Sequence, residues 1–229
     1  VQLMKITSLG HSSLLIETSG KRLLVDPFIT GNDKVKGKID IKDLKPNYIL
    51  VTHAHQDHTL DVEEIGKMSK ATVVSNFEIA THYENKGLKA HPMNHGGSWK
   101  FDFGTLKYVN AIHTSSFPDG TYGGQPGGFI LSSEGKHIYI AGDTALTMDM
   151  KLIPMSFKLD LAVLPIGDNF TMGVDDAILA SSFVECPKIL GYHYDTFGYI
   201  VIDHKESVQK FSEYGKELIL LEIGGSLTV

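Results

Sequence analysis

The stretch LVTHAHQDHTLD, residues 50–61, places three histidines and two aspartates directly after a short apolar run. Imidazole nitrogens and carboxylate oxygens are side-chain ligands for zinc and other divalent ions. His53 and His55 are two residues apart, and in extended backbone such side chains point to the same side. Asp57 and His58 follow where the chain turns toward a predicted helix, so they aim at a displaced point. The spacing favours a metal site over a solvated polar loop.

Three further candidate ligands stand where later apolar runs stop. His113 ends LKYVNAIH, Asp143 ends HIYIAGD after Gly142, and His193 ends KILGYH. Open α/β folds place their sites at such strand ends, although a lone His or Asp there is often a cap or turn residue. In combination with the 53–58 cluster, we interpret all three as ligands.

The number of candidates indicates the kind of site. A closed structural zinc site takes four ligands, usually including thiolates. Here the candidates number six or seven, and the single cysteine, Cys186, lies apart from them. An aspartate is able to bridge, so the set favours two divalent ions roughly 3.5–4 Å apart, as used in hydrolysis. Zinc is the expected metal, with manganese, nickel or iron as alternatives.

The elements that position these residues are mostly strands. Apolar or alternating runs predict strands and hairpins at 4–10, 12–26, 48–52, 72–76, 99–113, 127–143, 159–168, 187–195 and 217–225. Hairpin turns are predicted at Ser19-Gly20, near Gly104-Thr105, and at Glu134-Gly135. Helices are predicted over 61–70, with Asp61 as N-cap, and over 77–87, 174–186 and 203–214. These elements predict a mixed α/β fold with two packed sheets and outer helices, in one domain of two β-rich halves spanning 1–229.

Composition excludes several other classes of protein. Of 229 residues 42% are apolar, and the net charge of −6 is dispersed, so duplex nucleic acid is not an expected partner. No apolar run reaches the ~20 residues of a membrane span. The opening VQLMKITSLG lacks a secretory signal, and Met4 is a candidate initiator. The single Cys186 suits a reducing compartment, so the cytoplasm is expected.

The motif THAHQDH, joined in order by His113, Asp143 and His193, resembles the metallo-β-lactamase superfamily over essentially the whole chain. The resemblance implies a four-layer αββα sandwich, in agreement with the strand pattern. Shorter stretches, including LGHSSLLIE, AGDTALTMDM and LPIGDNFTMG, look like compact bacterial and archaeal metal-dependent hydrolases of unassigned substrate. These are similar to the sugar-phosphate lactonase branch, which carries an N-terminal Gly-His.

The resemblance also implies roles for individual residues. The first metal would be held by His53, His55 and His113. The second metal would be held by Asp57, His58 and His193, with Asp143 bridging the two. Asp26, in LLVDPF, matches an aspartate that supports the metal loops from outside the ligand shell. His11 matches the N-terminal Gly-His, which implies a role in the active site beside the catalytic Asp57 or just outside the ligands, with a structural role as the alternative.

Departures from other branches narrow the resemblance. No C-terminal extension like that of glyoxalase II is evident, and no insertion resembles the tRNA-clamping arm of tRNase Z. Asp rather than Cys occupies position 143, unlike several true β-lactamases.

The expected reaction is hydrolysis of an ester, lactone or phosphoester in a small-molecule substrate by a metal-bridging hydroxide, which Asp57 orients and deprotonates. The alternatives are an iron-dependent oxygenase on the same ligands, a phosphodiesterase or RNA-processing nuclease, and a metal-binding protein without chemistry. The chain is compatible with a homo-oligomer.

Substrate contacts are the least constrained prediction. Candidates lie on predicted loops close in sequence to the ligands: Asn94, His95, Ser115, Ser116, Asp168, Asn169 and Tyr194. Because Asn, Asp and Ser are common in turns regardless of function, turn chemistry is the alternative for most of them.

Overall fold

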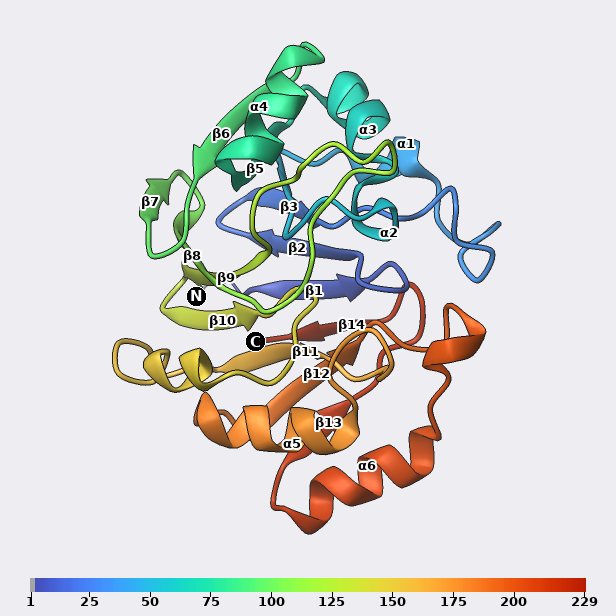
Figure 1. Ribbon diagram of the computed structural model, residues 1–229, viewed down its shortest axis with the longest axis vertical. Helices are drawn as coiled ribbons and strands as arrows, with labels where there is room; N and C mark the ends of the chain where they lie inside the picture. Colours follow the sequence, from blue (N-terminus) through green and yellow to red (C-terminus); the bar gives the residue numbers. More distant parts are fainter. Residues whose placement is uncertain (1–2) are drawn as a thin grey trace.

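The computed structural model describes residues 3–229, so the first two of the three residues before Met4 lie outside the described part. Two seven-stranded sheets face each other (Figure 1). The first contains, in spatial order, β14 (Ser226–Thr228), β1 (Lys5–Ser8), β2 (Leu14–Thr18), β3 (Lys21–Val25), β4 (Tyr48–Leu50), β5 (Thr72–Asn76) and β6 (Lys89–Met93). The second contains β13 (Glu217–Ile219), β12 (Lys188–Tyr192), β11 (Leu161–Pro165), β10 (Lys136–Ile140), β9 (Gly127–Ser133), β8 (Gly104–Asn110) and β7 (Ser98–Phe101).

Helices cover the outer face of each sheet (Figure 1). The first sheet is covered by α1 (Ile41–Leu44), α3 (Val62–Ser69) and α4 (Phe77–Asn85), with the short α2 (Gln56–Thr59) nearby. The second is covered by α5 (Val174–Phe183) and α6 (His204–Glu213), with the 3₁₀ turns η1 (Met148–Leu152) and η2 (Gly198–Ile200). This confirms the predicted αββα sandwich.

Both faces of each sheet are buried. On β2, Leu14 and Ile16 point into the core between the sheets, and Leu15 packs under the helices. Because successive strand residues point to opposite faces, a strand buried on both sides is apolar without interruption. That is why β2, β3 and β11 are apolar runs rather than alternating ones.

Two of the three predicted hairpin turns lie where expected. Ser19 and Gly20 have φ of 49° and 71°, and Glu134 and Gly135 have φ of 52° and 75°, as a two-residue type I′ turn requires. The turn predicted near Gly104 comes earlier, because Phe101 pairs with Gly104. Phe103, inside that turn, is buried between the sheets, and this core contact shifts the turn toward the N-terminus.

The four predicted helices form, with one difference in capping. Asp61 precedes α3, but its carboxylate accepts hydrogen bonds from the backbone nitrogens of Ile29 at 2.5 Å and Thr30 at 3.0 Å. The Asp61 side chain therefore fixes the segment after β3 rather than the first turn of α3. At α4 the side chain of Asn76 accepts from the Ile79 nitrogen at 2.9 Å and caps the helix.

The C-terminal segment differs from the predicted single strand over 217–225. β13 ends at Ile219, and the chain then crosses to the first sheet, where β14 pairs antiparallel with β1. The first and last strands of the chain are thus neighbours (Figure 1). Across residues 3–229, no helix combines the length and the apolar character that a membrane span requires.

Parallel pairing collects the ligand candidates at one edge. β3 pairs in parallel with β4, and β10, β11 and β12 pair in parallel with one another. The carboxyl ends of neighbouring parallel strands point the same way, so residues that follow them lie together. Asp26 directly follows β3, Asp143 is the third residue after β10, and His193 directly follows β12.

Gly142 lets the chain after β10 turn closely against the first sheet. Its φ is +68°, and a Cβ there would lie 2.7 Å from the Gly127 oxygen and 2.9 Å from the Thr52 Cβ. Gly135 has a similar φ of +75° but meets no described atom within 4 Å. We expect Gly135→Ala to lower the free energy of unfolding by about 1–2 kcal/mol through strain alone. Gly142→Ala should cost at least about 2 kcal/mol more, because overpacking adds to strain. Urea unfolding measures both, and equal losses would contradict the packing role.

Candidate metal centre

The first group of ligand candidates contains His53, His55 and His113. Their ligand atoms all lie within 4.8 Å of one another, and His53 Nε2 is 3.1 Å from His55 Nδ1. His53 Nδ1 lies 3.0 Å from Thr52 Oγ1, whose hydrogen is donated to Asp26 at 2.6 Å. Nδ1 of His53 must therefore carry the proton, which leaves the Nε2 lone pair free for an ion.

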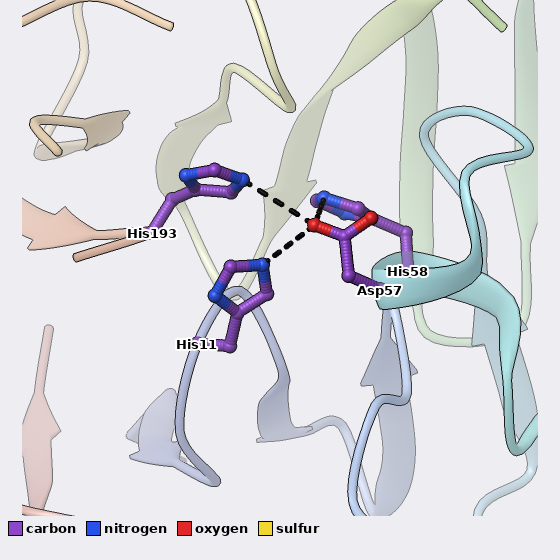
Figure 2. Close-up of side chains that lie close together, drawn as sticks. All are labelled: His11, Asp57, His58 and His193. Atoms are coloured by element: carbon purple, nitrogen blue, oxygen red, sulfur yellow. Dashed lines mark hydrogen bonds and ion pairs between the residues drawn. The ribbon is translucent and has the colours of Figure 1, made fainter. Parts of the chain in front are cut away.

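The second group contains Asp57, His58, His193 and His11. Figure 2 shows three imidazole rings directed at one carboxylate oxygen of Asp57. The distances to Asp57 Oδ2 are 2.8 Å from His11 Nε2, 3.5 Å from His58 Nε2 and 3.6 Å from His193 Nε2. Oxygen and imidazole donors converging in this way are suited to a divalent ion.

Asp143 lies between the two groups. Its Oδ2 is 3.0 Å from His193 Nε2, 3.2 Å from His58 Nε2, 3.6 Å from His113 Nε2 and 3.7 Å from His53 Nε2. One carboxylate oxygen is thus within reach of histidines from both groups. This is the position that a bridging ligand would occupy.

The hydrogen bonding of the cluster is incomplete without a cation. Among residues 3–229, the buried atoms that make no hydrogen bond include Asp143 Oδ1 and His193 Nδ1, and the Nε2 atoms of His58 and His193 face Asp143 Oδ2 at 3.2 and 3.0 Å as ion-pair partners without hydrogen-bond geometry. Buried polar atoms are normally paired, and an unpaired one costs free energy. Lone pairs on Nε2 atoms and carboxylate oxygens are the donors that zinc and similar ions accept, so the residues fit divalent metal ions.

Asp26 supports the cluster from behind. Its carboxylate is fully buried and accepts hydrogen bonds from the Thr52 nitrogen at 2.8 Å and from His58 Nδ1 at 2.8 Å. With Nδ1 of His58 donating, Nε2 of that ring faces Asp57 and Asp143. Asp26 therefore sets the tautomer and the orientation of His58.

Charge coupling controls the protonation of the metal-free cluster. Burial disfavours a charge on His193, but the Asp143 carboxylate outweighs it and raises the pKa of His193 to about 9. Burial likewise opposes charge on His58, yet Asp143, Asp57 and Asp26 raise its pKa well above the usual value. Burial would raise the pKa of Asp143, but His193 and His58 hold it well below its usual range. Burial lowers the pKa of His53, which stays neutral.

Three residues at the site adopt left-handed backbone although none is glycine. The φ angles are 53° at His11, 43° at Asp26 and 56° at His193. Such conformations cost of order 1 kcal/mol or more and persist only where the surroundings enforce them. The His193 nitrogen donates to the His11 oxygen at 3.1 Å, so one backbone hydrogen bond holds two of them and ties the two sheets together.

His11 connects the second group to the segment after β12. Its Nδ1 lies 2.7 Å from Thr196 Oγ1, while Nε2 faces Asp57. Burial lowers the pKa of His11 to about 4, against the opposing effect of the hydrogen bond to Asp57. A neutral ring with Nε2–H donates to the Asp57 carboxylate and accepts from the Thr196 hydroxyl.

A cavity of about 790 Å³ opens beside the cluster. It is lined by Phe28, His55, Gln56, Asp57, His113, Thr114, Asp143, Phe170, His193, Phe197, Gly198 and Tyr199. Candidate ligands form one part of the lining and aromatic rings the other.

The residues predicted to touch substrate lie elsewhere. Among the residues described, Asn94, Ser115, Asp168, Asn169 and Tyr194 are all absent from the lining of this cavity. Ser115 Oγ accepts a hydrogen bond from the Ala54 nitrogen at 3.1 Å and thereby holds the backbone between His53 and His55. Asp168 and Asn169 form a left-handed turn, with φ of 61° and 55°. Their types reflect turn geometry rather than contact with the cavity.

The other two predicted substrate contacts, His95 and Ser116, are likewise absent from the lining of this cavity. His95 Nε2 bonds the Pro126 oxygen at 2.9 Å, and Ser116 forms an isolated bridge with Tyr122. Sequence reasoning missed Phe28, Gln56, Thr114, Phe170, Phe197 and Tyr199. A usable signal existed, because Phe28 is two residues after Asp26 and Thr114 directly follows His113.

The chain belongs to the β-lactamase superfamily, whose domain model matches residues 5–193. A "UPF0173 metal-dependent hydrolase" from Christiangramia forsetii is 69% identical over 98% of this chain and 99% of its own length. Among solved structures, Igni18, described as a novel metallo hydrolase from Ignicoccus hospitalis, superposes with a TM-score of 0.90 at 31% identity, covering 99% of this chain and 98% of that one. The protein is therefore a metal-dependent hydrolase, as the motif indicated.

A more distant structure shares the fold. An isothiocyanate hydrolase from Delia radicum gut bacteria superposes with a TM-score of 0.79 at 19% identity, covering 98% of both chains. At this identity the likeness extends to the fold alone.

Replacing Asp26 by Asn should weaken metal binding about 10- to 100-fold. The amide nitrogen has no lone pair to accept a hydrogen bond from Thr52 or His58, so His58 loses its fixed tautomer. Asp160→Asn is the matched control. The Asp160 carboxylate also accepts a hydrogen bond from a backbone nitrogen, that of His137 at 2.9 Å, but it does not belong to the cluster. Competition with a zinc chelator measures the affinity, and equal affinities for the two variants would contradict the role of Asp26.

Metal uptake should release protons at pH 7. His193, with a pKa of about 9, and His58, with its raised pKa, are protonated in the metal-free protein and must lose their protons to bind a metal. We expect about one to two protons released per protein, and zinc affinity that rises between pH 6 and 8. Calorimetry in buffers of different ionisation enthalpy counts the protons released. Metal uptake without proton release would show that these imidazoles do not exchange protons for metal.

Proposed function

We propose that the protein is a binuclear metal-dependent hydrolase, with zinc in both positions, that cleaves an ester, lactone or phosphoester bond. The observation that carries the proposal is the position of Asp143 Oδ2, within 3.7 Å of Nε2 atoms from His53 and His193. Each of these histidines belongs to a different ligand group. A single shared carboxylate between two groups supports two ions rather than one.

Two ions would be held by distinct sets. His53, His55 and His113 would hold one, and Asp57, His58 and His193 the other, with Asp143 shared. Bound divalent ions act as Lewis acids and lower the pKa of water toward neutrality, which supplies the nucleophile.

Asp57 is the residue we assign to proton transfer. Its side chain lines the cavity, and its Oδ2 accepts from His11 Nε2 at 2.8 Å. The His11 ring is itself held by Thr196, so the carboxylate is kept in one orientation. Asp57 would orient the attacking water and accept its proton, and the proton would pass from there to the departing oxygen.

The cavity supports a small-molecule substrate. Its volume of about 790 Å³ is within the range of small-ligand sites, and it borders both ligand groups. Gln56 and Thr114 provide polar contacts at its rim, next to the ligands Asp57 and His113. Because Cys186 is the single cysteine and is buried, we place the reaction in the cytoplasm.

His55→Ala should remove metal from the first group and lower kcat at least about 100-fold. Elemental analysis should show fewer zinc equivalents per protein, and an ester hydrolysis assay should show the loss of turnover. His91→Ala is the control, since His91 lies on β6 against Trp99 and Phe101. Full activity in His55→Ala, or iron with oxygen consumption in the wild type, would overturn the proposal.

A further inference from the structure

Aromatic side chains from three separate loops form one wall of the cavity. Phe28 follows β3, Phe170 follows β11, and Phe197 and Tyr199 follow β12. Ring centroids are 6.3 Å apart for Phe28 and Phe197, and 6.1 Å apart for Phe170 and Tyr199. The wall begins at the buried Phe28, beside His11 at 5.7 Å, and reaches the surface at Tyr199.

The outer rings of this wall are exposed. Phe170 is 51% exposed and Tyr199 is 78% exposed. Apolar side chains gathered at the mouth of a cavity indicate a surface that an apolar ligand covers.

The segment that carries two of the rings is held in place. Ile200, which directly follows Tyr199 in the chain, is completely buried. The Asp195 nitrogen donates to the Ile200 oxygen at 2.8 Å, and Asp195 Oδ1 accepts from the Ile202 nitrogen at 3.1 Å. Phe197 and Tyr199 are therefore presented by a fixed turn, so the wall is formed before a ligand arrives.

In the described part of the chain, the side chains that could be cationic in the cavity lining are histidines that are candidate metal ligands. Within the described residues, its lining contains no lysine or arginine, while Asp57 and Asp143 contribute carboxylates. Lys34 and Lys38 line a different cavity. Protein sites for phosphate groups use arginine, lysine or helix N-termini. With the histidines neutral as metal ligands and with Asp57 and Asp143 nearby, a phosphate added to the metal-loaded protein would depend on the metal ions alone.

We infer that the substrate is a neutral carboxylic ester or lactone whose acyl part is apolar and about the size of a phenyl ring or a six-carbon chain. The inference rests on the proposed hydrolase function and names its substrate class. Hydrolysis breaks the acyl carbon–oxygen bond, and the water oxygen joins the acyl carbon. One water proton goes to the released alcohol oxygen and the other stays on the new acid, so atoms and charge balance.

The first test measures binding to the metal-free protein, which does not depend on turnover. Calorimetry compares 4-phenylbutanamide, which is neutral, with phenyl phosphate. We expect the amide to bind at least about tenfold more tightly, and Phe170→Ala and Tyr199→Ala to weaken it about fivefold or more. Tyr214→Ala is the control, because Tyr214 is 64% exposed at the end of α6 and away from the cavity lining. Tighter binding of phenyl phosphate, or unchanged binding in both variants, overturns the inference.

The second test uses the zinc-loaded enzyme with 4-nitrophenyl acetate, 4-nitrophenyl hexanoate and bis(4-nitrophenyl) phosphate. We expect kcat/KM for the hexanoate to exceed that for the acetate by at least about tenfold, and Phe170→Ala to remove most of this preference. A higher kcat/KM for the phosphodiester than for the hexanoate overturns the inference. If the binding preference holds but none of the three compounds is hydrolysed, the proposed function fails while the assigned ligand class stands.

Discussion

The buried carboxylate of Asp143 is the constraint on which the site depends. Asp143 is 2% exposed, and a carboxylate removed from water is tolerated only when positive charge or hydrogen bonds compensate it. Here the compensation comes from imidazole rings, with His193 and His58 nearest at 3.0 and 3.2 Å. Protons provide the compensating charge in the metal-free protein. Metal ions would replace them at the same points, so one arrangement serves both states.

Two sheets must meet at one end for these rings to reach Asp143. His58 comes from α2, in the segment that follows β4 of the first sheet, whereas His193 directly follows β12 of the second. Hydrogen bonds across the sandwich hold the two ends in register, from Tyr108 Oη to the Thr52 oxygen at 2.9 Å and from the Gly127 nitrogen to the same oxygen at 3.2 Å. The left-handed backbone at His11 and His193 is held by the hydrogen bond from the His193 nitrogen to the His11 oxygen.

The ligand candidates were predictable because local rules place them. His53 and His55 share a side through strand geometry, and Asp143 and His193 stand where apolar runs stop. The cavity lining was not predictable in the same way, because its rings come together only through tertiary packing of three loops. The polar residues Asn94 and Asp168 resembled substrate contacts, but turn geometry explains them. The crossover of β14 to β1 was also missed, because SLT is too short to show a strand pattern.

The segments that carry the aromatic wall differ in how directly they are connected to the candidate ligands. Phe197 is four residues after His193, in a segment whose Asp195 is bonded to His204 of α6 at 2.5 Å, so a shift there moves both a ligand and the wall. Phe170 lies on a loop after β11 from which no candidate ligand comes. Since fixed ligands need rigid support and specificity can reside on independent loops, Phe170 is where substrate preference can change with the least disturbance of the metal centre.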